Sequence, residues 1–207
     1  MLNLKTFFET HLPITDGIFV NHNLEYTIKP VKEGLSNSPQ EISIKIVAYR
    51  KNDDFSKVTI GEILLWKVSP EFMLTVNNCD IHREYNAVCN NGEIFTLAST
   101  QNILSRSSAY TTVYRDIISQ NANIYLLSNL YVKEAYRRKG FGSAFLALLP
   151  EIVEHCCDEK LTVLTLTSSP LDIPYGLSKA EAHKKLNLFY EKNGFTLHGD
   201  DTAIKIH

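Results

Sequence analysis

The feature that most constrains this chain is a strand, a glycine-bearing turn and a helix that follow one another between residues 124 and 154. The apolar run Ile124–Val132 is typical of a buried β-strand. After the turn, apolar residues recur at the three- and four-residue spacing of an amphipathic helix. These residues are Phe141, Ala144, Phe145, Leu148, Leu149, Ile152 and Val153. Any fold of this chain must therefore let a strand enter the turn and a helix leave it.

The turn carries a concentration of positive charge. Four cations crowd the predicted helix start: Lys133, Arg137, Arg138 and Lys139. A helix N-terminus already carries positive partial charge, so each cation there is unfavourable by roughly a few tenths of a kcal/mol. A bound anion would remove the conflict, because Gly140 and Gly142 permit close backbone approach and the first helical N–H groups are free donors. The turn therefore predicts a phosphate or pyrophosphate site; the alternative is four solvated cations at an exposed helix start.

Two segments of the chain carry a family resemblance. The turn, Arg137-Arg-Lys-Gly-Phe-Gly142, has the form R/Q-x-x-G-x-G/A between a strand and a helix. Further on, the sequence reads Leu186-Asn-Leu-Phe-Tyr-Glu-Lys-Asn-Gly-Phe195. In this order, the segments resemble the acetyl-CoA-binding motif and the L-Y-E-K-x-G-F signature of the GNAT N-acetyltransferase superfamily. The resemblance covers residues 25–207 in outline and is sharp over 124–195.

The resemblance implies the fold of one GNAT domain over residues 1–207. Its class is mixed α/β (α+β), the acyl-CoA N-acyltransferase fold, with a twisted, mixed and mostly antiparallel sheet flanked by helices. The sequence agrees, because strand-like runs at 24–31, 41–50 and 57–68 follow one another with polar turns between them. Such a succession favours an antiparallel meander.

The last third of the chain has its own local signals. The run 161–167 is β-branched and apolar, as in a strand buried on both faces and paired parallel to the strand at 124–132. Ser178 and Glu181 form a capping-box pattern that begins a last helix, and Gly194 is placed to end it. Two short strands are then expected, at 195–197 and 202–206.

Two regions depart from the commonest layout of the family. Residues 1–23 are expected to be an N-terminal extension. Residues 70–122 fit strands poorly, and the segments 80–88 and 109–119 each favour a helix. A helical insertion is therefore expected before the strand at 124–132, in the bacterial type of the domain.

The resemblance implies that acetyl-CoA binds at the strand and turn as a cosubstrate. The backbone groups of Leu130, Tyr131 and Val132 would hydrogen-bond its pantetheine arm as an added strand does. The turn would hold the pyrophosphate, with Arg137 and Lys139 adding charge. The turn residues are Arg138, Lys139, Gly140, Phe141, Gly142 and Ser143. Asn187 either contacts the cofactor or is an ordinary solvated helix residue.

Tyr190 occupies the position of the family's tyrosine, whose phenol acts as general acid for the departing thiolate. The alternative is a plain aromatic residue on the buried face of its helix. An unperturbed phenol has a pKa of about 10 and a thiol one of about 8.5, so full proton transfer in water is uphill by roughly 2 kcal/mol. Burial makes a thiolate a stronger base and can close this gap.

An acceptor amine is protonated at neutral pH and must lose a proton before it attacks. Glu62, Asp80 and His82 are the candidates for the base. Glu62 is the leading one because it interrupts an apolar strand, although a strand glutamate can equally point to solvent. Ser128 and Asn129 are polar where apolar residues are expected, and they either line the cleft or satisfy each other.

Several other classes of function are disfavoured. The Walker A, dinucleotide G-x-G-x-x-G and nucleophile-elbow G-x-S-x-G patterns are absent from the sequence. Cys79, His82 and Cys89 hint at metal-ligand spacing without a fourth ligand, so no metal is expected. A formal net charge of -2 gives no general attraction to nucleic acid or to an anionic membrane. Four cysteines, with no signal-like or membrane-length apolar run, favour a reducing cytoplasm.

The sequence thus predicts an acyltransferase that moves the acetyl group of acetyl-CoA to an amine by direct attack. The amine belongs to a small molecule, a peptide N-terminus or a lysine side chain, and the enzyme is expected to be a monomer or homodimer. One alternative is a non-catalytic CoA-binding module with a regulatory or interaction role. Another is a different phosphorylated ligand at the basic turn.

Overall fold

The computed structural model describes residues 19–35, 37–50, 57–85, 91–170, 173, 176–199 and 201–207. The predicted N-terminal extension, 1–23, lies outside these residues except for its end. That end belongs to the first strand, which begins at Phe19 and is therefore longer than the predicted 24–31.

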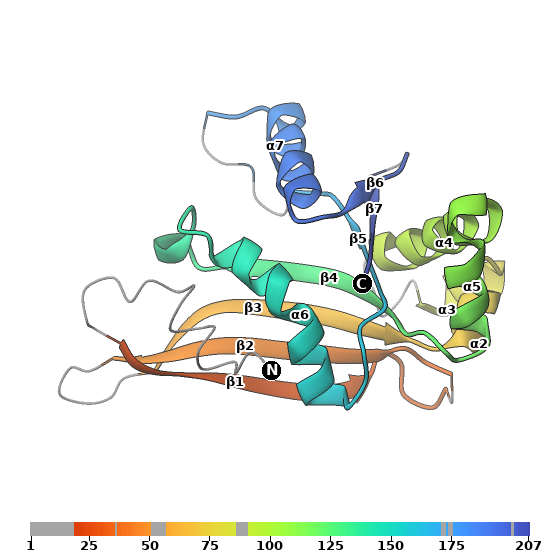
Figure 1. Ribbon diagram of the computed structural model, residues 1–207, viewed down its shortest axis with the longest axis horizontal. Helices are drawn as coiled ribbons and strands as arrows, with labels where there is room; N and C mark the ends of the chain where they lie inside the picture. Colours follow the sequence, from red (N-terminus) through yellow and green to blue (C-terminus); the bar gives the residue numbers. More distant parts are fainter. Residues whose placement is uncertain are drawn as a thin grey trace.

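One seven-stranded sheet runs through the described residues (Figure 1). Its strands are β1 (Phe19–Pro30), β2 (Gln40–Arg50), β3 (Lys57–Val68), β4 (Ile124–Val132), β5 (Val163–Thr167), β6 (Thr196–Leu197) and β7 (Thr202–Ile206). They lie in the order β1-β2-β3-β4-β5-β7-β6. Every neighbouring pair is antiparallel except β4 and β5, which run parallel. The predicted mixed, mostly antiparallel sheet and its parallel pair are confirmed.

Helices fill the remaining described segments. They are α2 (Pro70–Thr75), α3 (Cys79–Tyr85), α4 (Asn91–Arg106), α5 (Thr111–Ile118), α6 (Phe141–Cys157) and α7 (Lys179–Lys192), with 3-10 turns η2 (Ser108–Tyr110) and η3 (Glu134–Tyr136). Helices were expected between β3 and β4, and the described residues of that segment form four. The sequence indicated α3 and α5 but neither α2 nor α4, the longest of the four.

The helices cover both faces of the sheet, which gives the protein two apolar cores. On one face α6 lies across the strands (Figure 1) and packs Phe145, Leu149 and Ile152 against Ile44 and Ile63. On the other face α2 to α5 gather at one end of the sheet, against side chains of β3, β4 and β5. Those side chains are Trp66, Val68, Ile124, Leu126 and Val163. The helices predicted within 70–122 therefore form the second layer of the fold.

The ends of α7 are fixed by local hydrogen bonds, as the sequence predicted. The Ser178 hydroxyl accepts from the Glu181 N–H at 3.3 Å, and the Glu181 carboxylate accepts from the Ser178 N–H at 2.9 Å. At the other end Gly194 has φ +85° and donates to the Glu191 carbonyl, while Phe195 donates to the Tyr190 carbonyl. This is the Schellman pattern, which ends the helix at Lys192.

Candidate functional site

The parallel pair β4–β5 separates soon after it begins. In the described residues the pairing covers three positions, from Ile124 opposite Val163 to Leu126 opposite Thr165. β4 then continues to Val132, while β5 ends at Thr167. On the side of β5, the edge of β4 beyond Leu126 therefore offers backbone N–H and C=O groups that no described strand uses, and such groups require a partner when they are covered.

A β-bulge marks the point of separation. On the other edge of β4, Leu65 lies opposite Leu127, but Leu64 lies opposite Asn129. Ser128 is thus an extra residue in the ladder. A bulge bends its strand and increases the local twist, so it turns the second half of β4 away from β5. The bulge and the lost pairing together open the sheet here.

The turn after β4 presents backbone donors at the start of α6. Gly140 is the N-cap residue, with φ +85°, and within the described chain no side chain caps the helix there. The N–H groups of the first helical turn, which includes Gly142 and Ser143, are therefore available to an anion. Arg138 also has a positive φ of 61°, a conformation that costs a non-glycine residue of order 1 kcal/mol.

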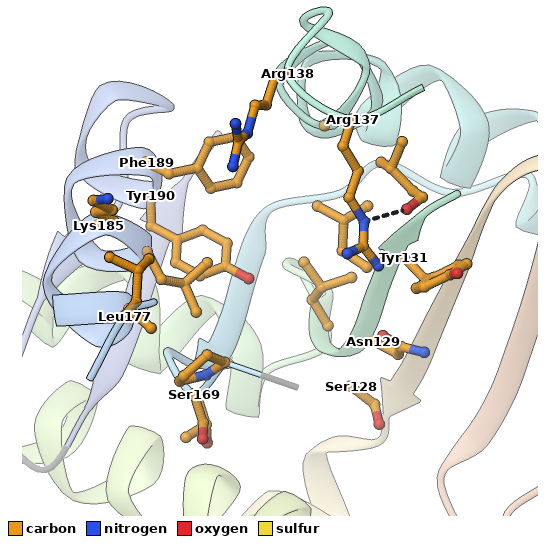
Figure 2. A pocket seen from close by; sticks show the side chains of 18 residues that line it. Ser128, Asn129, Tyr131, Arg137, Arg138, Ser169, Leu177, Lys185, Phe189 and Tyr190 are labelled. Carbon is orange, nitrogen blue, oxygen red and sulfur yellow. Dashed lines mark hydrogen bonds between the residues drawn. The ribbon is translucent and has the colours of Figure 1, made fainter. Parts of the chain in front are cut away.

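The cations of this turn have different surroundings. Arg137 donates from Nε to the Val132 carbonyl at 2.9 Å, and its guanidinium lies 5.3 Å from the centre of the Tyr131 ring. Lys139 lies 6.0 Å from the Tyr136 ring centre. Arg138 reaches the cavity described next (Figure 2), and none of the described residues makes such a contact with it. Arg137 thus braces the turn against β4, and Arg138 is the cation best placed for a ligand.

A cavity of about 440 Å³ lies between these elements and α7. Its walls come from β4, the basic turn, the end of β5 and one face of α7 (Figure 2). The residues that the sequence had assigned to a site and that line it are Leu130, Tyr131, Val132, Arg137, Arg138, Gly142 and Tyr190. Ser128, Asn129, Ser169 and Phe189 also line it. Segments that are distant in the sequence therefore meet at one hollow.

Tyr190 lies at the α7 wall of the cavity. Its side chain is 8% exposed and packs edge-on against Phe195 and Phe189, with ring centres 5.4 and 5.3 Å away. Its hydroxyl points toward the cavity (Figure 2). Burial raises the pKa of Tyr190 to about 12, because the phenolate is poorly solvated there. The phenol is therefore fully protonated at neutral pH.

Other predicted site residues lie away from the cavity lining. Phe141 is buried in the α6 core, where it packs against Tyr136 and Phe145. Lys139, Gly140 and Ser143 belong to the turn but do not line the cavity. The Asn187 side-chain carbonyl accepts a hydrogen bond from Ser168 at the end of β5, so it ties α7 to the sheet.

The proposed bases also lie outside the lining. Glu62 is exposed on β3, opposite Tyr131. Asp80 is exposed on α3 and pairs with Arg83 at 3.4 Å, and His82 lies edge-on to Phe95 at 5.3 Å. Cys89 lies outside the described residues. A base role for any of the three candidates remains a prediction.

Glu93 is a residue that sequence reasoning missed. It lies in the first turn of α4, and its carboxylate accepts a hydrogen bond from the Ser128 hydroxyl at 2.8 Å. Ser128 and Glu93 are 35 residues apart in the sequence, and α4 itself was not predicted. The only available signal was the polar pair Ser128 and Asn129 in an apolar strand.

Comparison with known families places the chain. Residues 91–197 match the acetyltransferase (GNAT) domain, which is more than half of the sequence. The protein therefore belongs to the GNAT acetyltransferase family. The matched segment contains α4, β4, the basic turn and Tyr190, so it includes every wall of the cavity. No curated protein sequence is significantly similar to this chain.

Solved structures with a related fold are distant. One is a KacTA–DNA complex, with TM-score 0.42 and 10% identity over 90% of this chain and 93% of that one. Another is mosquito arylalkylamine N-acetyltransferase-like 5b, with TM-score 0.43 and 15% identity over 79% and 74%. A third is arylalkylamine N-acetyltransferase 2 from Aedes aegypti, with TM-score 0.38 and 12% identity over 78% and 72%. These similarities are too distant to transfer a substrate or a partner to this chain. In the described residues no helix has the length and apolar character needed to cross a membrane.

Proposed function

We propose that this protein transfers the acetyl group of acetyl-CoA to an amine by direct attack of the amine on the thioester. One observation carries the proposal: a single cavity joins the basic turn at the start of α6, the unpaired edge of β4 and the hydroxyl of Tyr190. Family membership alone would not carry the proposal, because it does not say which side chains of this chain converge.

The residues present fit acetyl-CoA. Its pyrophosphate carries negative charge, which suits the first N–H groups of α6, uncapped by any side chain in the described chain, and the Arg138 guanidinium at the cavity. Its pantetheine arm contains amides, which can pair with the open edge of β4 at Leu130 to Val132 as another strand would. When bound, acetyl-CoA supplies an acyl group activated as a thioester.

Tyr190 is proposed to donate the proton that the departing sulfur needs. In the step, the deprotonated amine nitrogen forms a bond to the acyl carbon, the carbon–sulfur bond breaks and the phenol proton moves to sulfur. The proton that the nitrogen loses as the amide forms returns to the phenolate through solvent. With the pKa of the buried Tyr190 at about 12 against about 8.5 for a thiol in water, full transfer from this site to a fully solvated thiolate would be uphill by roughly 5 kcal/mol. The sulfur leaves inside the same cavity, where poor solvation raises the basicity of a thiolate as well. Tyr190 therefore acts as a donor that is always protonated.

We also infer that residues 1–207 act as one domain, because strands from both halves of the chain share one sheet. The acceptor is an amine on a small molecule or a protein. The remaining assigned residues, Lys139, Gly140, Phe141 and Ser143, would contribute through backbone groups and charge around the turn. Asn187 would contribute indirectly, by holding α7 against β5.

The test is calorimetric titration of the purified chain with acetyl-CoA, followed by assays of thiol release with a panel of amines. The panel should include tryptamine, spermidine and a lysine-containing peptide, because these probe aromatic, polycationic and protein acceptors. Micromolar binding together with release of CoA in the presence of one amine supports the proposal. Binding without release from any amine would favour the non-catalytic module, and absence of binding would reject both.

A further inference from the structure

Two oxygen atoms beside the β4 bulge have no hydrogen-bond partner among the described residues. They are Oε2 of Glu93 and Oδ1 of Asn129, and both are shielded from solvent. A shielded polar atom that lacks a partner costs about 1–3 kcal/mol, more if it is charged, so such atoms are rare in native proteins. Two of them next to one residue call for a physical explanation.

Ser128 connects the two atoms. Its hydroxyl donates to Oε1 of Glu93 at 2.8 Å, which holds the carboxylate against β4. Asn129 is the next residue, and Figure 2 shows the side chains of Ser128 and Asn129 close together at the β4 wall. Both residues line the cavity that contains the Tyr190 hydroxyl. Asn129 therefore lies at the cavity where β4 and β5 separate, and Glu93, which is not itself among the lining residues, lies directly behind Ser128.

The chemistry of this group selects a cation with several N–H donors. A carboxylate oxygen and an amide oxygen both accept hydrogen bonds, and the Ser128 proton is already used by Glu93. A protonated primary amine carries one positive charge and three N–H donors, which match the charge of Glu93 and both free acceptors. An anion or an apolar group has no N–H donor to offer, so the two buried oxygens would remain without a hydrogen bond.

We propose that Glu93, Ser128 and Asn129 form the subsite that receives the ammonium group of the acceptor, and that Glu93 takes its proton. This assignment rests on the proposed acetyl transfer and names the base for it. One N–H proton moves to the Glu93 carboxylate, and the nitrogen lone pair that it frees attacks the thioester carbon. Ser128 acts as a positioning residue, because its hydroxyl holds Glu93 in place.

The first test compares Glu93→Gln with Glu154→Gln, an exposed glutamate on the opposite layer. Transfer to benzylamine is followed by thiol release at saturating acetyl-CoA. Glu93→Gln should lower kcat/KM for benzylamine about 100-fold or more, as expected for loss of a base. It should lower the value far less for trifluoroethylamine, which is largely unprotonated at neutral pH. Acetyl-CoA affinity should stay within twofold, and Glu154→Gln should match the wild type.

Thermal melting gives an independent reading. Glu93→Gln removes an unpaired, charged carboxylate oxygen, so the variant should melt no lower than the wild type. If Glu93 had only a structural role, the variant should melt at a lower temperature. Ser128→Ala should lose part of the benzylamine activity even if Glu93→Gln folds poorly. Equal losses for the two amines, or full activity of Glu93→Gln, would overturn the assignment.

A binding arm separates this assignment from the proposed function. If the wild type binds acetyl-CoA but acetylates no amine, the transfer proposal fails and the subsite is judged by ligand stabilisation alone. Millimolar benzylammonium should then raise the melting temperature of the wild type and not that of Glu93→Gln. Equal shifts for the two proteins, or no shift for either, would rule the subsite out.

Discussion

Thr100 on α4 and Thr165 on β5 form a hydrogen bond in the core, with 2.7 Å between their hydroxyl oxygens. Both residues are completely buried. The Thr100 hydroxyl also lies 2.7 Å from the Thr96 carbonyl, to which it donates its one proton. Thr165 is therefore the donor within the pair. This bond fixes α4, and with it Glu93, against the strand that forms the opposite wall of the cavity.

The direction of that bond predicts unequal effects of two similar substitutions. Thr100→Val should lower the free energy of unfolding by about 1–3 kcal/mol, because it leaves the buried Thr165 O–H without an acceptor. Thr165→Val should cost less, since Thr100 keeps its bond to Thr96. Urea denaturation of both variants and of the double variant measures the difference. Equal losses would mean that the assigned donor and acceptor roles are wrong.

The same threonines explain why α4 was not predicted from the sequence. Thr96 and Thr100 lie on its buried face, where their hydroxyls meet Thr167 and Thr165 on β5. A helix whose buried face is partly polar lacks the clean apolar period on which prediction depends. By contrast, α7 has local signals at both ends, in Ser178 and Gly194, and it was predicted almost to the residue.

The candidate site divides in the same way. Arg137, Arg138 and Gly142 belong to one contiguous motif, so their common location could be predicted from sequence order. The position of Tyr190 opposite them follows from the family resemblance. Glu93 could not be found, because its relation to Ser128 depends on how a layer of helices docks on the sheet. The sequence also could not show that Glu62 faces solvent.

Gly61 on β3 sets the close approach of α6 and β4. A Cβ atom at this position would lie 2.6 Å from the Phe145 ring and 2.6 Å from the Tyr131 carbonyl oxygen. Gly61→Ala should therefore lower the free energy of unfolding by about 1–3 kcal/mol, as overpacking does. It should also weaken acetyl-CoA binding, because Tyr131 lines the cavity. Gly199→Ala is the control, since nothing lies within 4 Å of its Cβ position.

The outcome for Gly61→Ala is read from chemical denaturation and calorimetry together. Stability and cofactor affinity should both fall for Gly61→Ala and stay unchanged for Gly199→Ala. If Gly61→Ala were as stable as the wild type, β3 and Phe145 would be able to move apart at little cost, which contradicts a rigid contact between them.

Arg138 provides a test of the anion site that avoids the strained glycine. Gly140 has φ +85°, so any side chain there disturbs the backbone as well as the site. Arg138→Gln removes one charge instead. It should weaken acetyl-CoA binding roughly tenfold, or about 1.4 kcal/mol, and the difference should shrink as salt screens the charge. Titrations at low and high ionic strength measure this, with exposed Arg115→Gln as control. A loss of affinity that does not depend on salt would mean that Arg138 contributes through packing and not through its charge.

His198 predicts a dependence of stability on pH. It is partly buried, with Nε2 lying 3.3 Å from the Tyr110 hydroxyl, and burial lowers its pKa below the ordinary value. The folded state thus favours neutral imidazole more than the unfolded state does. The contribution is complete above about pH 6.5 and is lost as the pH falls through the folded pKa. Melting temperatures from pH 8 to pH 5 should fall less for His198→Gln than for the wild type; parallel curves would show that His198 is not involved.

Tyr190→Phe isolates the proposed proton donor. The variant keeps the ring that packs against Phe195 and Phe189 and loses only the hydroxyl. Turnover with the best amine should fall about 100-fold or more, the range for loss of a general acid, while acetyl-CoA affinity stays within twofold. The control is Tyr110→Phe, which removes a hydroxyl outside the cavity lining.

Because burial raises the pKa of Tyr190 to about 12, the wild-type rate should show no loss from its ionisation between pH 7 and about pH 10. Unchanged turnover in Tyr190→Phe would assign the proton to another donor and leave Tyr190 as a core residue of α7.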